Sequence, residues 1–168
     1  MKEYKVGIIG GTGMVGQRFI TLMENHPWFR LTVIAASARS AGKPYGEAAE
    51  KRWVMPSPIP ACARDLVVMD AVADAEKIAS LVDFCFCAVD MPKDEIRALE
   101  ERYAKLECPI VSNNSAHRWT EDVPMVVPEI NPEHLAVIPH QRKRLGTERG
   151  FIAVKSNCSL QSYVPALH

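Results

Sequence analysis

Short apolar runs alternate with amphipathic stretches along this chain of 168 residues. The apolar runs that predict buried strands lie at 6–9, 31–36, 66–69, 83–90, 109–112 and 151–156. Apolar residues at helical spacing predict helices at 15–23, 73–81, 96–106 and from 158 onward. Strands that alternate with helices favour an α/β fold with a doubly wound, Rossmann-type parallel sheet. Residues 43–64 are rich in proline and predict an excursion with little regular structure.

The first predicted strand leads into a turn that contains Gly10, Gly11, Gly13 and Gly16, and a helix follows. Glycines let the backbone turn tightly and approach a pyrophosphate, and the free N–H groups and dipole at a helix start favour negative charge. The spacing Gly10-x-x-Gly13-x-x-Gly16 differs from the more common GxGxxG motif. The pattern predicts a dinucleotide site, and a tight strand–helix turn without a ligand is the alternative.

The residues after the second predicted strand bear on the choice between NAD and NADP. In a dinucleotide fold, a carboxylate at this place accepts a hydrogen bond from the ribose 2′-OH of NAD. This chain instead has Ser37, Arg39, Ser40 and Lys43, and its first carboxylate there is Glu47. Hydroxyls and cations suit a 2′-phosphate, so the sequence predicts NADP. A solvated polar loop is the alternative.

Ligands of such sheets bind beyond the carboxyl ends of the strands. This rule places the segments 10–16, 37–40, 88–90 and 113–118 along one edge of the predicted sheet. The last segment ends in Arg118, whose guanidinium can hold a phosphate or a carboxylate through two hydrogen bonds. A surface arginine in a salt bridge is the alternative.

The last predicted strand is followed by Asn157, a good helix N-cap, and by Cys158 in the first helical turn. A thiol at a helix start has a lowered pKa and a larger thiolate fraction. The other cysteines lack this setting, and Cys85 and Cys87 fall in a predicted core strand. Cys158 is therefore the candidate nucleophile, with a structural cysteine as the alternative. His117 is expected to be a structural partner.

Composition limits the classes of partner. The chain has 20 Lys+Arg and 20 Asp+Glu, so no net charge draws it to nucleic acid or to an anionic membrane. It shows neither a signal-peptide pattern nor an apolar stretch long enough to span a bilayer. Five cysteines without C-x-x-C pairs argue against a disulfide framework and against a metal site. A reducing, cytoplasmic location is expected.

Four motifs occur together and in this order, at residues 10–16, 112–118, 127–131 and 156–159. Their combination resembles aspartate-semialdehyde dehydrogenase, nearer the branch shared by archaea and fungi. The resemblance implies an NADP-dependent oxidoreductase of the aspartate pathway to lysine, threonine and methionine. It implies that 4-aspartyl phosphate is reduced to aspartate 4-semialdehyde, or the reverse, through a thioacyl intermediate on Cys158. Asn157 and the helix-start N–H groups are then placed to stabilise the oxyanion.

The implied contacts fall into two groups. Those expected for the cofactor lie in the glycine turn, after the second strand and at the end of the fourth: Gly10, Thr12, Gly13, Met14, Val15, Ser37, Arg39, Ser40, Cys87 and Ala88. Arg118 and Asn114 are expected to bind the substrate or its phosphate, and no metal is expected.

Members of that family are considerably longer, with a second α+β domain that supplies a histidine base and the dimer interface. We therefore expect residues 1–155 to form the dinucleotide-binding domain and residues 156–168 to begin a truncated catalytic domain. The chain alone is expected to be inactive, and the full-length protein to be a homodimer or homotetramer. Open alternatives are N-acetyl-glutamyl-phosphate reductase, malonyl-CoA reductase, or a non-catalytic NADP-binding module.

Overall fold

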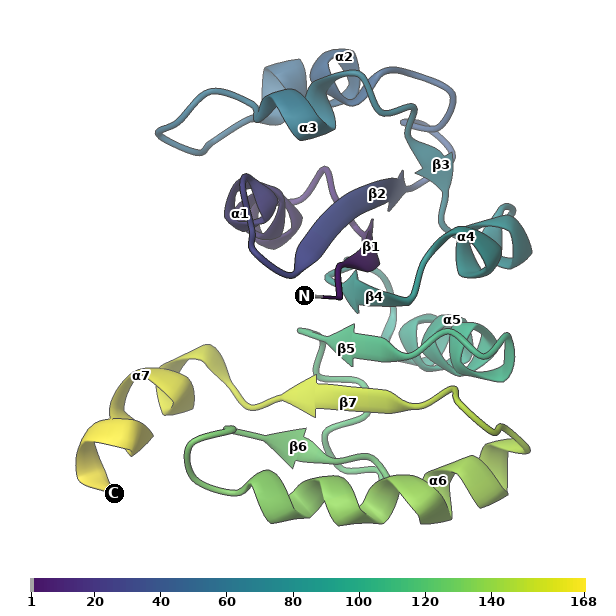
Figure 1. Ribbon diagram of the computed structural model, residues 1–168, viewed down its shortest axis with the longest axis vertical. Coiled ribbons are helices and arrows are strands. Elements are labelled where there is room, and N and C mark those ends of the chain that lie inside the picture. Colours follow the sequence, from purple (N-terminus) through teal and green to yellow (C-terminus); the bar gives the residue numbers. More distant parts are fainter. Residues whose placement is uncertain (1) are drawn as a thin grey trace. The chain divides into compact units, whose positions relative to one another are not determined.

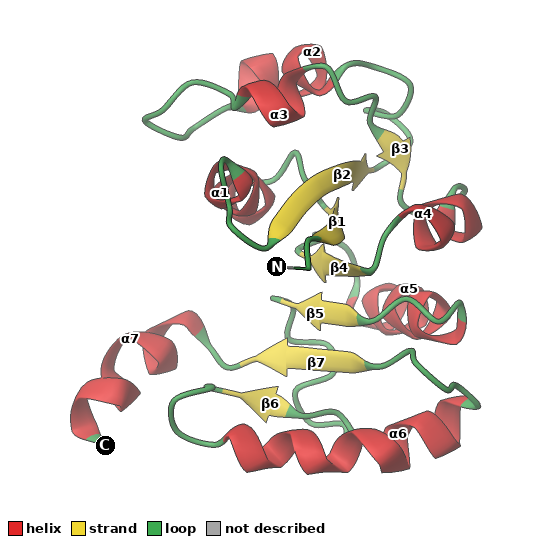
Figure 2. Ribbon diagram, in the orientation of Figure 1, coloured by secondary structure: helices red, strands yellow, loops and turns green. Residues whose placement is uncertain are grey.

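The computed structural model describes residues 2–168, which divide into two compact units, one ending at Asp90 and the other beginning at Met91. Each unit combines strands with helices (Figures 1 and 2). Every pairing between the named strands within a unit is parallel. The predicted α/β fold with a parallel, Rossmann-type sheet is confirmed.

The first unit contains β1 (Tyr4–Ile9), α1 (Met14–Met23), β2 (Phe29–Ala36), α2 (Tyr45–Ala49), η1 (Glu50–Arg52), α3 (Ala61–Arg64), β3 (Met69–Asp70), α4 (Ala75–Leu81) and β4 (Phe84–Cys87). Its strands lie in the order β3-β2-β1-β4. The chain moves outward from β1 through β2 to β3 and then returns to the other side of β1. Right-handed connections therefore place α1 and α4 on opposite sides of the strands, as Figure 1 shows.

Helix α1 packs on β1 and β2 through a mixed face. Its buried residues are Gly16, Gln17, Ile20 and Met23. Leu22, one of the apolar positions that predicted this helix, is 51% exposed. The buried glutamine on the inner face is unusual for a helix of this kind, because polar side chains are buried only where they find hydrogen-bond partners.

The prediction that residues 43–64 hold little regular structure is wrong. The segment forms α2, η1 and α3, and Pro44 and Pro60 are the N-cap residues of α2 and α3. Proline near the first helical turn costs no hydrogen bond, so these prolines start the helices instead of breaking them. Tyr45 is completely buried, and Trp53 packs against the same core.

The bounds of the third and fourth strands also differ from the prediction. The apolar run at 66–69 was expected to be a strand, but β3 comprises only Met69–Asp70. Val67 instead forms an isolated antiparallel bridge with Pro44, which ties the run to the start of α2. The fourth strand was predicted at 83–90 but comprises only Phe84–Cys87, and Cys85 and Cys87 are both fully buried in it, as expected of core residues.

The second unit contains α5 (Lys93–Lys105), β5 (Ile110–Ser112), β6 (Met125–Val126), η2 (Pro132–Val137), α6 (Ile138–Leu145), β7 (Ile152–Lys155) and α7 (Cys158–Leu167). Its strands lie in the order β5-β7-β6, with β7 in the centre (Figure 1). The two-residue strand β6 is too short to be read from an apolar run. The central strand β7 carries the C-terminal candidate site at its carboxyl end.

All five cysteines are free thiols. Within residues 2–168, no cluster of three or more His, Cys, Asp or Glu side chains could hold a metal ion. None of the helices in this part of the chain has the length and apolar character needed to cross a membrane.

Candidate active site

Two glycines of the turn between β1 and α1 are required by the packing of the chain itself. Gly10 has a φ of +89°, and a Cβ at this position would lie 2.3 Å from the carbonyl oxygen of Ala88. A Cβ on Gly16 would lie 2.2 Å from the carbonyl oxygen of Gly10. Both neighbours are backbone atoms, so a side chain at either position would force the turn and its surroundings apart.

Gly13 differs from these two glycines. Its backbone, with φ −79° and ψ 161°, is open to any residue, and an added Cβ would meet only the Gly10 carbonyl oxygen at 3.5 Å. Gly13 is the N-cap of α1, which has neither a capping side chain nor an acidic residue in its first turn. The first N–H groups of α1 therefore lack side-chain partners, and Gly13 is exposed. This arrangement fits a phosphate group.

The turn is braced by two side chains that the sequence analysis did not identify. The hydroxyl of Tyr45 donates to the carbonyl oxygen of Gly11 at 2.7 Å. The buried amide of Gln17 donates to the carbonyl oxygens of Thr12 and Arg52, at 3.0 and 2.7 Å. Burial raises the pKa of Tyr45, so its hydroxyl remains a neutral donor. The sequence contained one signal for this bracing, the polar residue Gln17 on the inner face of α1.

The polar residues after β2 occupy different environments. Ser37 and Arg39 are exposed, whereas Ser40 is buried. The Ser40 hydroxyl accepts a hydrogen bond from Nη2 of Arg52 at 3.0 Å. Arg52 comes from η1, within the segment predicted to be irregular, and brings a further cation to the residues predicted to bind a 2′-phosphate.

The remaining predicted cofactor contacts differ in how much surface they offer. Met14 is exposed, and Thr12, Val15 and Ala88 are partly exposed. Cys87 is fully buried, so its side chain belongs to the core of the first unit. Its assignment as a cofactor contact remains a prediction.

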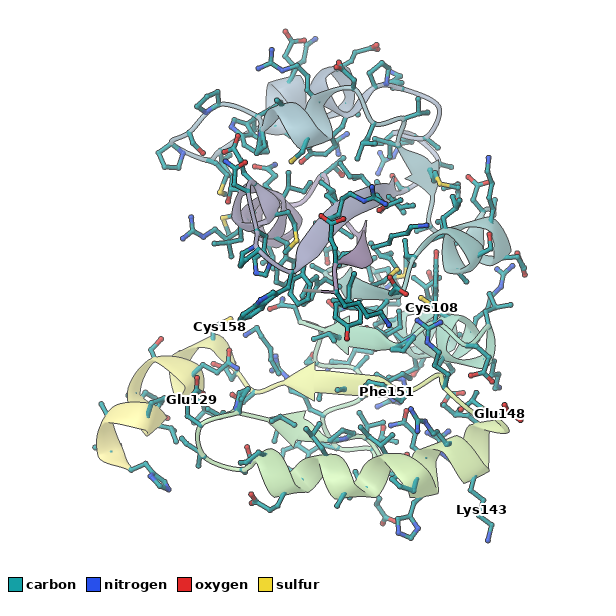
Figure 3. All side chains as sticks on the ribbon, viewed as in Figure 1. Cys108, Glu129, Lys143, Glu148, Phe151 and Cys158 are labelled. Atoms are coloured by element: carbon teal, nitrogen blue, oxygen red, sulfur yellow. The ribbon has the colours of Figure 1, made fainter. Side chains whose placement is uncertain are left out.

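Cys158 lies where the sequence analysis predicted, in the first turn of α7. Strand β7 ends at Lys155, and the side chain of Asn157 caps α7 by accepting a hydrogen bond from the N–H of Ser159 at 2.9 Å. Cys158 is exposed. Figure 3 shows it beyond the arrowhead of β7, at the opposite end of the strand from Phe151.

The electrostatic setting of Cys158 is dominated by Lys155, which the sequence analysis did not single out. The ammonium Nζ of Lys155 lies 3.2 Å from Sγ of Cys158. This hydrogen bond and the charge of Lys155 lower the pKa of Cys158, with smaller contributions from its own backbone N–H and from Arg118. Burial instead raises the pKa of Cys62, the other exposed cysteine. A larger thiolate fraction makes Cys158 the better nucleophile of the two.

Arg118 reaches the same strand end from the loop after β5. Its Nε donates to the carbonyl oxygen of Lys155 at 3.2 Å, and its Nη2 donates to that of Asn113 at 3.3 Å. Within residues 2–168, neither Arg118 nor Lys155 forms an ion pair with a carboxylate. The structure thus brings two cations and an exposed thiol together.

Asn114 and His117 support the loop that carries Arg118. The side-chain amide of Asn114 donates to the buried carboxylate of Glu100 at 3.0 Å, and its backbone N–H donates to the hydroxyl of Ser112 at 3.0 Å. His117 is 2% exposed, and its Nδ1 lies 3.1 Å from the hydroxyl of Thr120, in line with its expected structural role. Asn114 as a substrate contact remains a prediction.

A parallel α/β fold whose glycine turn leads into an uncapped helix defines the class: a Rossmann-type nucleotide-binding domain. The family model described as "Semialdehyde dehydrogenase, NAD binding domain" matches residues 5–138. The chain belongs to this family. The aspartate-semialdehyde dehydrogenase of Archaeoglobus fulgidus is 43% identical over 94% of this chain and 43% of its own length. That of Methanothermobacter thermautotrophicus is 46% identical over 92% of this chain and 42% of its own length.

Solved structures agree with this assignment. Aspartate-semialdehyde dehydrogenase with NADP from Candida albicans is 35% identical, with a TM-score of 0.84 over 99% of this chain and 46% of that chain. The Vibrio cholerae enzyme II complexed with ASA is 24% identical, with a TM-score of 0.70 over 99% of this chain and 46% of that chain, and supports the fold alone. The resemblance drawn from the motifs is confirmed. The chain spans less than half the length of these relatives.

Proposed function

We propose that this chain is the part of an aspartate-semialdehyde dehydrogenase that binds NADP and carries the nucleophile Cys158. One observation carries the proposal: an exposed cysteine with a lowered pKa, at a capped helix start, beside two cations that have no carboxylate partner among residues 2–168. The relatives' shared name supplies the reaction class. The reaction is the reduction of 4-aspartyl phosphate to aspartate 4-semialdehyde, in the pathway to lysine, threonine and methionine.

The chemistry follows from the side chains at this helix start. The Cys158 sulfur attacks the acyl carbon of 4-aspartyl phosphate, an S–C bond forms, the C–O bond breaks, and phosphate leaves with the electron pair. NADPH, when bound, supplies the hydride that reduces the resulting thioester. Collapse of the sulfur adduct then releases the aldehyde and returns the thiolate. Asn157 and the first N–H groups of α7 are suited to stabilise the oxyanion, and Arg118 to bind the phosphate.

The glycine turn supplies the cofactor part of the proposal. The uncapped start of α1 and the absence of a side chain at exposed Gly13 suit the pyrophosphate. Ser37, Arg39 and Ser40, with Arg52 beside Ser40, suit the 2′-phosphate that distinguishes NADP from NAD. The Candida albicans relative contains NADP, which supports the same choice here. Calorimetry checks it: NADP should bind more tightly than NAD, and the opposite order would exclude the 2′-phosphate assignment.

The rest of the catalytic apparatus is proposed to lie outside this chain. A second α+β domain would supply the histidine base and the subunit interface of a homodimer or homotetramer. Residues 1–155 are then the dinucleotide-binding domain and residues 156–168 the beginning of the catalytic domain. A reducing, cytoplasmic location follows from the need for a free thiol at Cys158.

The nucleophilic role of Cys158 is tested on the protein isolated from the cells that produce it, at the length it has there. Incubation with 4-aspartyl phosphate without NADPH should leave an aspartyl group on Cys158, detected by peptide mass spectrometry. Cys158→Ser should abolish the label, and Cys62→Ser should retain it. Labelling by N-acetyl-glutamyl phosphate or malonyl-CoA instead would assign one of the related reductases. No label from any of the three would leave a non-catalytic NADP-binding module.

A further inference from the structure

We propose that Lys155 and Arg118 form one anion site, occupied by the Cys158 thiolate in the resting chain and by phosphate during acyl transfer. The phosphate half of this inference rests on the proposed function. The thiolate half depends only on the geometry around β7 and α7. Lys155 thereby becomes a positioning residue that determines how reactive the nucleophile is.

The contacts of Lys155 leave its charge available to the sulfur. Its Nζ lies 3.2 Å from Sγ of Cys158 and 3.2 Å from the carbonyl oxygen of Ser156. No carboxylate within residues 2–168 pairs with it. An ammonium has three N–H donors, so these two contacts leave one donor for a further anion.

Arg118 is tied to the same residue. Its Nε donates to the carbonyl oxygen of Lys155 and its Nη2 donates to that of Asn113, so the guanidinium uses two of its five N–H donors within residues 2–168. The two side chains together carry two positive charges. The thiolate neutralises one of them, which leaves a net positive charge beside the sulfur. A second anion is therefore attracted to this place.

Acyl transfer moves negative charge over a short distance within such a site. The thiolate loses its charge as the S–C bond forms, and the departing phosphate gains it as the C–O bond breaks. A cation already in contact with the sulfur can stabilise both ends of this transfer without a large movement. Lysine suits this role because its ammonium is a compact charge with several donors on a flexible stem.

The thiolate half is tested on the 168-residue chain with iodoacetamide, a neutral reagent whose rate reports the thiolate fraction. Lys155→Met should move the pH midpoint of Cys158 alkylation upward. At pH 7 the rate should fall about two- to fivefold, the range expected for an exposed pair screened by solvent. Lys155→Arg, which keeps the charge, should restore most of the rate.

Lys143→Met is the matched control, because Lys143 is exposed on α6 and Figure 3 shows it at a distance from Cys158. It should leave the alkylation profile unchanged, and the thermal melts of all variants should coincide. An unchanged midpoint in Lys155→Met would overturn the thiolate half. A shift of equal size in Lys143→Met would do the same, because the effect would then be one of overall charge.

Inorganic phosphate tests the second half. It should slow alkylation of Cys158 more than chloride does at equal ionic strength, and Arg118→Met and Lys155→Met should each remove the difference. Equal slowing by both salts would overturn the phosphate half. The outcome is separable from the proposed function. The anion site can pass these tests while 4-aspartyl phosphate fails to label Cys158, and labelling can succeed while Lys155→Met has no effect.

Discussion

Replacing Gly13 with alanine separates a glycine needed by a ligand from a glycine needed by the fold. The new methyl group would meet only the Gly10 carbonyl oxygen, at an ordinary contact distance of 3.5 Å. The backbone conformation at Gly13 is one that alanine adopts without strain. The protein itself therefore gives little reason for a glycine here, whereas a pyrophosphate at the start of α1 would be pushed away by the methyl group.

The expected magnitudes differ sharply between stability and binding. Alanine is a poorer N-cap than glycine, but it also removes about 0.4–1 kcal/mol of unfolded-chain entropy. We therefore expect the stability of Gly13→Ala to stay within about 0.5 kcal/mol of the wild type. A hydrogen bond from a backbone N–H to a charged phosphate contributes about 1.5–3 kcal/mol. Losing one such bond should weaken NADP binding by about ten- to hundredfold.

The assay combines thermal unfolding with calorimetric titration of NADP. Gly16→Ala is the matched control, because its Cβ would lie 2.2 Å from the backbone oxygen of Gly10. That variant should lose about 1–3 kcal/mol of stability, and its melting temperature should fall by several degrees. The reasoning is refuted if Gly13→Ala binds NADP within about threefold of the wild type, or if it melts as early as Gly16→Ala.

Three further predictions concern stability and the bracing of the turn. Gly150→Ala should destabilise the protein by about 1–3 kcal/mol or more, because a Cβ there would lie 1.8 Å from the α5 backbone. Circular dichroism should show a lower melting temperature, and an unchanged melt would contradict this close approach. Backbone N–H groups, foremost that of Glu148, hold the pKa of Glu107 below its ordinary value. The ionised Glu107 carboxylate therefore stabilises the fold at pH values above its unfolded-state pKa, and this stabilisation is lost as the pH falls through its folded-state pKa. Glu107→Gln should melt earlier than the wild type near neutral pH and together with it in strong acid. A difference independent of pH would assign the loss to packing. Tyr45→Phe leaves the carbonyl of Gly11 without its donor and should cost about 1–3 kcal/mol while weakening NADP binding; unchanged affinity in a destabilised variant would show that the brace serves the fold alone.

Sequence reasoning succeeded where neighbours along the chain decide the outcome. The turn from β1 into α1 and the Asn157 cap before Cys158 depend on residues within one helical turn of each other. Local propensity and hydrogen bonding act over that range, so the pattern of residues is enough to predict them. The motif order and the family assignment follow from the same local information.

Only the tertiary structure decided which distant side chains complete these sites. Tyr45 binds the carbonyl of Gly11 across 34 positions, and Arg118 binds the carbonyl of Lys155 across 37. The first contact is not predictable from the sequence pattern, because the prolines of residues 43–64 indicate an irregular segment. Pro44 and Pro60 instead begin short helices. The second exists because β5 and β7 pair side by side, which brings the loop after one strand to the end of the other.

The chain's own sequence therefore determined the cysteine at the start of α7 and the glycine turn into α1, because each is built from consecutive residues. It did not determine the charge environment of that cysteine or the bracing of that turn. Both depend on strand order and on helices folding back over the sheet, and the free energy of such contacts is set by burial and distance rather than by position in the sequence.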